Sequence, residues 1–168
     1  MENLATKQHM DTVEKTSART IALDYGERRI GVAVSDELGI TAQAQPTITV
    51  KDVSDAVKRV GEFIGNYSGV TIVIGLPLGV NGEQGPAAEK VKQFGEKLKL
   101  YFPEIISVEY FDERFTSKQA ERTLREMNIK PSRNKEKVDA LSAVFILQGY
   151  LALQEAKKAV FYLSNSIE

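Results

Sequence analysis

The stretch ALDYGERRIGVAVSD, residues 22–36, decides the fold of this chain. Apolar residues 20–23 and 30–35 flank a short polar turn around Gly26, and two such segments joined by a turn predict an antiparallel β-hairpin. The first segment ends at Asp24. An aspartate at a strand end either serves the turn or belongs to a binding site, because ligands bind at strand ends in open α/β sheets. The remaining sequence is needed to choose between these explanations.

Downstream of the hairpin, the chain alternates between strand-like and helical patterns. The expected elements are a third strand around 48–50, a helix over 53–64, a buried strand over 70–76, a helix over 87–98, a strand over 105–111, a helix from Thr116 and a long apolar helix over 138–151 that continues to 163. A hairpin or meander followed by alternating helix and strand predicts an α/β fold with one mixed β-sheet and helices on both faces. The apolar helix is expected to be buried.

The length and composition describe one globular domain without a membrane segment. The chain has 168 residues, enough for a single domain. We expect a polar, flexible lead-in over 1–19, one domain over 20–163 and a tail over 164–168. The sequence has no run of about 18 apolar residues, so we expect no membrane span. Cysteine is absent, which excludes disulfides and fits a cytoplasmic protein.

Acidic residues stand at two further places where a binding site can form. Asp112 and Glu113 follow the strand over 105–111, which we expect to be central in the sheet. Because side chains alternate along a strand, only one of the two faces a given site. Asp139 begins the apolar helix, and a carboxylate held close to the sheet there needs a partner. Each acid taken alone also has a simple explanation as a turn, loop or helix-terminal residue.

Carboxylates from three distant segments can converge at one end of a sheet. Oxygen ligands favour hard cations, so the implied metal is Mg²⁺ or Mn²⁺. The chemistry that uses such a cluster is phosphodiester hydrolysis with two metal ions, which bind the attacking water and the leaving oxygen. The sequence therefore predicts a site formed by Asp24, one member of the pair 112–113, and Asp139.

Four sequence motifs occur in order between Thr20 and Leu151. They are Ala22-Leu23-Asp24-Tyr25-Gly26 with Arg28-Arg29-Ile30-Gly31-Val32-Ala33, Ile74-Gly75-Leu76-Pro77-Leu78 with Asn81-Gly82 and Gly85-Pro86, Asp112-Glu113-Arg114-Phe115-Thr116-Ser117, and Lys137-Val138-Asp139-Ala140-Leu141-Ser142-Ala143. These motifs resemble those of the YqgF family, also called RuvX-like. Its members are ribonuclease-H-like proteins described as Holliday junction resolvases or pre-16S rRNA nucleases. Residues 1–19 lie outside the resemblance.

The resemblance implies roles for individual residues. It maps the catalytic, metal-binding acids of the family to Asp24, Glu113 and Asp139. Asp112 is a further metal-ligand candidate, which either supports Glu113 or faces the opposite layer. Glycine lets the backbone approach a site closely, and the loop residues expected near this one are Gly26, Gly75 and Pro77.

A basic segment lies beside two of the predicted acids. Between residues 114 and 137 the sequence has eight basic and three acidic residues, although the net charge of the whole chain is −1. Any one of these residues is explained equally well as a solvated surface charge, but their clustering favours a surface that binds phosphates. The predicted nucleic-acid contacts are Arg28, Arg29, Arg114, Lys118, Arg122, Arg125 and Arg133.

These observations predict a metal-dependent nuclease that hydrolyses phosphodiester bonds, and the resemblance favours processing of the 5′ end of pre-16S rRNA in ribosome biogenesis. One alternative is a Holliday junction resolvase in DNA recombination or repair, for which a dimer would match the two-fold junction. Another is a non-catalytic nucleic-acid-binding factor in ribosome maturation or transcription. An actin-like phosphotransferase ranks last, because it needs two such domains. Expected partners are RNA or branched DNA and a ribosomal particle; monomer and homodimer are both open.

Overall fold

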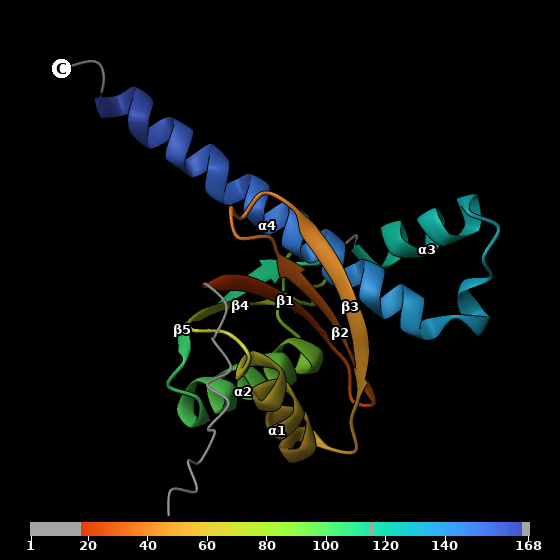
Figure 1. The fold of residues 1–168 in the computed structure, drawn as a ribbon. Helices are drawn as coiled ribbons and strands as arrows, with labels where there is room; N and C mark the ends of the chain where they lie inside the picture. The colour runs from red at the N-terminus through yellow and green to blue at the C-terminus, as the bar shows by residue number, and fades with distance from the viewer. Residues whose placement is uncertain (1–17, 115, 166–168) are drawn as a thin grey trace, which may run out of the picture.

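The computed structural model describes residues 18–114 and 116–165, and its centre is one mixed β-sheet (Figure 1). Within these residues the strands are β1 (Arg19–Tyr25), β2 (Arg29–Ser35), β3 (Ala42–Thr49), β4 (Val70–Leu76) and β5 (Ile105–Asp112), in the order β3-β2-β1-β4-β5. β1 and β2 form the predicted antiparallel hairpin, and β3 is antiparallel to β2. β4 runs parallel to β1, and β5 runs parallel to β4. The carboxyl ends of β1, β4 and β5 therefore meet at one edge of the sheet.

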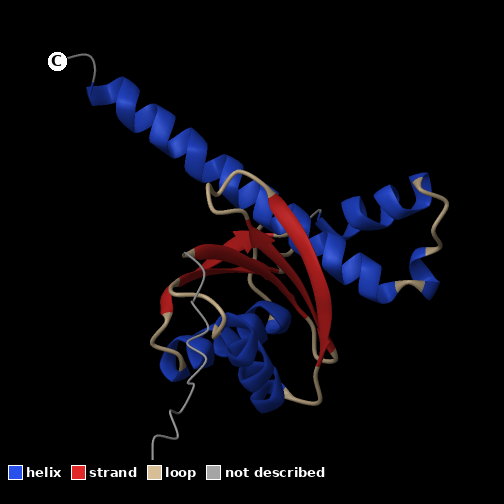
Figure 2. Cartoon of the chain, viewed as in Figure 1, coloured by secondary structure: helices blue, strands red, loops and turns tan. Residues whose placement is uncertain are grey.

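Helices cover both faces of this sheet, as Figure 2 shows in blue against the red strands. α1 (Val53–Ile64) and α2 (Pro86–Tyr101) lie on one face, and α4 (Lys135–Asn165) lies on the other. α3 (Thr116–Glu126) and the short 3-10 turn η1 (Pro131–Arg133) lie beside the N-terminal half of α4. The predicted α/β fold with a mixed sheet is confirmed. No described helix is both long enough and apolar enough to cross a membrane.

The two faces of the sheet carry side chains of different size. On β1, Ile21 and Leu23 point toward α1 and α2, where large aliphatic residues form the larger hydrophobic core. Ala22 points the other way and belongs to a smaller core with Ala143 and Leu147 of α4. Because side chains alternate along a strand, small residues at every second position let α4 lie close to the sheet. This close packing brings residues of α4 to the strand ends.

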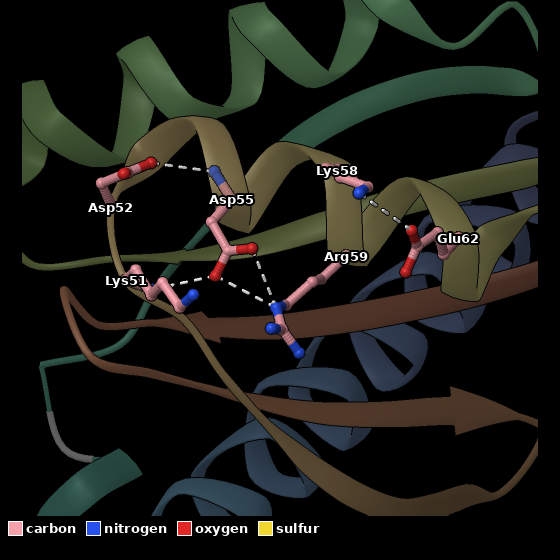
Figure 3. A network of polar contacts seen from close by, with 6 residues as sticks. All are labelled: Lys51, Asp52, Asp55, Lys58, Arg59 and Glu62. Atoms are coloured by element: carbon pink, nitrogen blue, oxygen red, sulfur yellow. Dashed lines mark hydrogen bonds and ion pairs between the residues drawn. The ribbon is translucent and has the colours of Figure 1, made fainter.

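Helix α1 carries a network of polar contacts on its outer surface (Figure 3). Asp52 caps the helix by accepting a hydrogen bond from the backbone amide of Asp55 at 2.9 Å. One turn later, Arg59 pairs with the carboxylate of Asp55 at 3.0 Å. Exposed pairs of this kind contribute little to stability. The surface lies on the side of the sheet opposite α4.

Two strands differ from their sequence-based expectation. β5 is an edge strand and not a central one, since in the described sheet it pairs only with β4. β3 begins at Ala42, well before residue 48. Its first four residues alternate alanine with glutamine, and Pro46 follows them, a composition that predicts a strand poorly. An edge strand tolerates this proline because its outer backbone groups face solvent.

Helix α4 also differs from expectation, because it is buried only in its middle. The helix continues past Leu151 as predicted, but Val160 and Phe161 are 66% and 62% exposed. It ends at Asn165 and so includes two residues of the expected tail. Residues 1–17 of the expected lead-in lie outside the described residues.

Candidate active site

Asp24 is placed at the end of β1 by the alternation of side chains along the strand. It lies two residues after Ala22 and therefore points to the same face, toward α4. Across the hairpin its partner is Gly31. The turn that follows is closed by the backbone, since the amide of Gly26 donates to the carbonyl oxygen of Arg29 at 3.0 Å. The half-buried carboxyl group of Asp24 is thus enclosed between the sheet and α4.

Asp139 approaches this point from α4 because Gly31 has no side chain. A Cβ atom on Gly31 would lie 2.0 Å from the backbone oxygen of Asp139, closer than packed atoms allow. The first turns of α4 therefore lie directly against β2, beside the end of β1. The charge of Asp139 raises the pKa of Asp24, which reflects how near the two carboxyl groups are.

Glu113 reaches the same side of the sheet from β5. Phe111 packs into the smaller core under α4, and alternation places Glu113 on that side too. A Cβ atom on Gly75 would lie only 2.1 Å from Glu113 Oε2, so the glycine allows the carboxyl group to lie across β4. Pro77 comes directly after the last residue of β4 and has no N–H group to continue the pairing. Gly75, a predicted loop residue, lies inside β4, and Pro77 directly follows that strand. Both residues shape the end of β4 at Glu113.

Asp112 is directed away from the cluster by its pairing with Arg114. Arg114 Nη2 lies 2.7 Å from Asp112 Oδ2, and hydrogen bonds from Arg114 hold the pKa of Asp112 below its ordinary value. Arg114 Nη1 also donates to the backbone oxygen of Val80 at 3.1 Å. Of the two neighbouring acids, Glu113 is therefore the one beside Asp24.

The carboxyl groups of Asp24 and Glu113 ionise at a higher pH than carboxyl groups in water. Burial raises the pKa of Asp24 to about 7; the charge of Asp139 adds to the rise, and the hydroxyl group of Ser142 opposes it. Ser142 Oγ is buried on α4 near this carboxyl group. Burial likewise raises the pKa of Glu113 to about 7, with smaller contributions from Asp24 and Asp112. Clustered acids with raised pKa values are typical of functional sites.

Arg29 joins the hairpin to α4 across the mouth of the site. Its Nε atom donates to Asp139 Oδ2 at 2.7 Å, and both side chains are partly buried. The pair lies in a hollow of about 410 Å³ lined by Asp24, Gly26, Glu27, Arg28, Arg29, Lys135 and Asp139. Carboxylates that can hold a cation and cations that can hold a phosphate therefore share one hollow.

Lys135 is a residue of this hollow that the sequence did not single out. It is the first residue of α4 and lies four positions, about one helical turn, before Asp139. Within the basic segment it has the same local character as its seven basic neighbours. The sequence signal that could have identified Lys135 is its position one helical turn before the predicted acid Asp139.

The remaining predicted phosphate contacts are distributed around the hollow. Arg125 lines a groove between α3 and α4, and Arg133 lines a further hollow together with Arg29. Lys118 and Arg122 are exposed on α3 and line none of these three depressions. The structure therefore separates the basic residues into those near the acids and those on the outer surface of α3.

The acids fit a divalent cation by their chemistry, although they do not form a closed ligand set. Among the described residues, no three acidic side chains lie close enough to coordinate one ion together. Asp139 is held by Arg29 and would have to exchange it for the cation. Carboxylate oxygens are the ligands of hard cations, and a cation would favour the ionised forms of Asp24 and Glu113 that burial disfavours.

The order of the strands, with acids at the carboxyl ends of β1 and β5, defines a ribonuclease-H-like domain. Its fold is similar to that of the Fowlpox virus resolvase in the crystal structure "Crystal structure of Fowlpox virus resolvase and substrate Holliday junction DNA complex", with a TM-score of 0.52. The sequences are 13% identical, and the match covers 81% of this chain and 98% of that one. At this identity the likeness concerns the fold.

The chain belongs to the RuvX family, whose model is described as "Holliday junction resolvase" and matches residues 18–153. The resemblance indicated by the four motifs is thereby confirmed. A relative from Sulfurihydrogenibium sp. (strain YO3AOP1), named "Putative pre-16S rRNA nuclease", is 46% identical over 134 residues, which are 80% of this chain and 90% of the relative. A relative of the same name from Ruminiclostridium cellulolyticum is 45% identical over 134 residues, 79% of this chain and 93% of the relative.

Proposed function

We propose that this chain is a divalent-cation-dependent nuclease that hydrolyses phosphodiester bonds of RNA and processes the 5′ end of pre-16S rRNA. The observation that carries the proposal is a group of partly buried acids, in which the carboxyl group of Asp24 lies near those of Asp139 and Glu113. Cationic side chains line the hollow that contains Asp24 and Asp139, whereas Glu113 does not line it. The choice of substrate is supported by the names of the relatives. A cytoplasmic location and a ribosomal particle as partner belong to the same proposal.

Acidic residues are assigned to the cations, and basic residues are assigned to the phosphate. Asp24, Glu113 and Asp139 would hold the cations, Mg²⁺ or Mn²⁺, while Asp112 acts on Glu113 through its charge. When bound, two such ions supply a lowered pKa for the attacking water and charge stabilisation for the leaving oxygen. In hydrolysis the water oxygen bonds to phosphorus, the bond to the ester oxygen breaks, and a proton from water ends on that oxygen or in solvent.

The basic residues orient the substrate at this cluster. Arg28, Arg29 and Lys135 face the hollow and bind the oxygens of the phosphate to be cut. The exposed basic residues of α3 contact phosphates further along the strand. Arg29 has a second role, because it compensates the charge of Asp139 while no cation is bound.

Resolution of four-way DNA junctions is a second candidate function. The description of the family model favours it. The same three acids would act on both substrates. The surfaces around the hollow, and not the hollow itself, would therefore determine whether RNA or a DNA junction is cut. A homodimer would suit the two-fold symmetry of a junction, whereas a single-stranded RNA end needs one site.

The decisive experiment compares cleavage of labelled single-stranded RNA and of four-way DNA junctions, with Mg²⁺, with Mn²⁺ and with a chelator. We expect cation-dependent cleavage of RNA that falls at least about a hundredfold in Asp24→Asn, as expected for a group that acts in the transition state. The matched control is Asp55→Asn, which removes a partly buried, ion-paired carboxylate on the opposite side of the sheet (Figure 3). Cleavage of junctions alone would select the resolvase. Binding without any cleavage would select a non-catalytic factor.

A further inference from the structure

A groove of about 770 Å³ lies between α3, η1 and the N-terminal half of α4. Arg29, Lys135 and Asp139 line both this groove and the hollow that contains Asp24. The two depressions are therefore continuous, and Arg29 and Lys135 stand at the passage between them. A chain molecule bound in the groove would lead directly to the acids.

The wall of the groove is held in place by backbone hydrogen bonds. α3 ends in a Schellman motif, in which the amide of Ile129 donates to Leu124 at 2.8 Å and the amide of Asn128 donates to Arg125 at 3.0 Å. Asn128 has a φ of 59°, the left-handed conformation that this motif requires and that asparagine tolerates. Asn134 Nδ2 then donates to the backbone oxygen of Lys130 at 2.9 Å. The groove is thus a preformed feature of the fold.

The lining of the groove combines positive charge with apolar surface. Its cationic side chains are Arg29, Arg125, Lys130 and Lys135, and its carboxylates are Glu121 and Asp139. Both carboxylates are already paired, Glu121 with Arg125 at 3.1 Å and Asp139 with Arg29 at 2.7 Å. The two lysines therefore give the groove an excess of positive charge. Ile129, Pro131 and Val138 add apolar surface beside these charges.

This combination matches a single strand of nucleic acid. Phosphates suit the cationic side chains, and unpaired bases or sugars suit the apolar ones. A volume of about 770 Å³ is that of a pocket for one drug-sized molecule, which leaves room for a short stretch of one strand and excludes a double helix. An acidic peptide would also match the charge, but the continuity with the acid cluster favours the nuclease substrate.

We propose that the groove between α3, η1 and α4 binds an unpaired segment of the substrate and leads it past Arg29 and Lys135 to Asp24. This inference rests on the proposed nuclease function and extends it. It requires the substrate to be single-stranded next to the cleaved bond, whether as RNA or as an unpaired arm of DNA. It also predicts that Arg125 contributes more to binding than Arg122 on the same helix, because only Arg125 lines the groove.

The test measures binding of a short fluorescent oligouridine strand by anisotropy, in chelator, over a series of salt concentrations. The groove variant is Arg125→Ala/Lys130→Ala. We expect its affinity to fall about tenfold and the slope of log K against log salt to fall by about 1.4, since each lost phosphate contact on a single strand removes about 0.7. The matched control is Arg59→Ala/Lys58→Ala on α1, which also removes one arginine with an i,i+4 carboxylate partner and one exposed lysine (Figure 3). Its affinity should equal that of the wild type.

Further measurements test the groove as the binding site separately from the nuclease function. Equal losses in Arg122→Ala and Arg125→Ala would overturn the groove as the binding site, while cleavage lost in Asp24→Asn would still support the nuclease. Competition by duplex RNA or by polyglutamate as strong as that by unlabelled oligouridine would also overturn it. Oligodeoxyuridine in place of oligouridine shows whether the groove takes RNA or DNA, and the groove variant should lose affinity for whichever strand binds more tightly.

Discussion

Replacing Asp24 by asparagine is expected to stabilise the folded chain, although it should abolish cleavage. Asparagine keeps the shape of the side chain and removes its charge. Burial raises the pKa of Asp24 from 3.8 to about 7. A shift of about three units at about 1.4 kcal/mol per unit means that ionised Asp24 lowers the free energy of unfolding by about 4 kcal/mol. Asparagine avoids this cost at every pH.

The dependence on pH follows from the direction of the shift. Between about pH 4 and pH 7 the unfolded chain has released the Asp24 proton and the folded chain still holds it. The folded state binds more protons, so its stability falls as the pH rises through this window. Glu113, whose pKa is also raised to about 7, adds a fall of the same sign. The advantage of Asp24→Asn should therefore be near zero at pH 4 and full by about pH 8.

The assay is urea unfolding followed by circular dichroism at pH 5 and pH 8, because the chain has no tryptophan for fluorescence. In chelator at pH 8, we expect the variant to be more stable than the wild type by about 2–4 kcal/mol. Added Mg²⁺ or Mn²⁺ should then stabilise the wild type, by about 2.7 kcal/mol at a hundred times the dissociation constant, and should leave the variant almost unchanged.

A variant that is no more stable than the wild type at pH 8 would refute this account of the acid cluster. Asp55→Asn is the control of opposite sign. Hydrogen bonds from Arg59 hold the pKa of Asp55 below its ordinary value, so removing that charge should slightly destabilise the chain above pH 4. If Asp24→Asn raises the free energy of unfolding and Asp55→Asn lowers it, the effect is due to the environment of each charge and not to asparagine in general.

Three further predictions concern the glycines that shape the site and the exposed end of α4. Gly31→Ala should lower the free energy of unfolding by about 3 kcal/mol in the same urea assay, because its Cβ would meet the backbone of Asp139 at 2.0 Å and α4 must move. Gly75→Ala should reduce cleavage at least about tenfold while costing no more than about 3 kcal/mol of stability, because the new methyl group displaces Glu113; unchanged cleavage would show that Glu113 is dispensable. Ending the chain after residue 154 should change stability by less than about 1 kcal/mol, since the described part of α4 beyond this point buries no side chain.

The hairpin and β4 could be predicted from sequence because their signals are local. Residues 70–76 are apolar on both faces, as a strand covered on both sides requires, and β4 has these bounds. The order of the strands could not be predicted from such local signals. The sequence before Asp112 gives no sign that β5 is the edge, because its apolar residues pack against α2 on one side and α4 on the other. Strand order depends on pairing between distant segments, which local periodicity does not encode.

For the site, sequence motifs could name the acids but not their environment. The ion pair between Arg29 and Asp139 joins residues 110 positions apart and depends on how α4 lies on the hairpin. The place of Glu113 beside Asp24 depends on the pairing of β5 with β4 and on the room that Gly75 leaves for the carboxyl group. The packing of α4 also places Lys135 in the hollow, although its local sequence resembles that of other basic residues. The ion pair and the place of Lys135 both depend on the position of α4, which no local sequence pattern encodes.

The position of α4 itself follows from an asymmetry between the two faces of the sheet. The face toward α1 and α2 carries isoleucine, leucine and valine, whereas the face toward α4 carries Ala22, Gly31, Ala33 and Gly75 near the site. Larger residues on the α4 face would bury more apolar surface and add stability. They would also hold α4 away from the strand ends and separate Asp139 from Asp24. The small residues therefore lower stability in two ways, by reduced packing and by bringing buried carboxylates together, and both effects are those expected of a surface shaped to bind a cation.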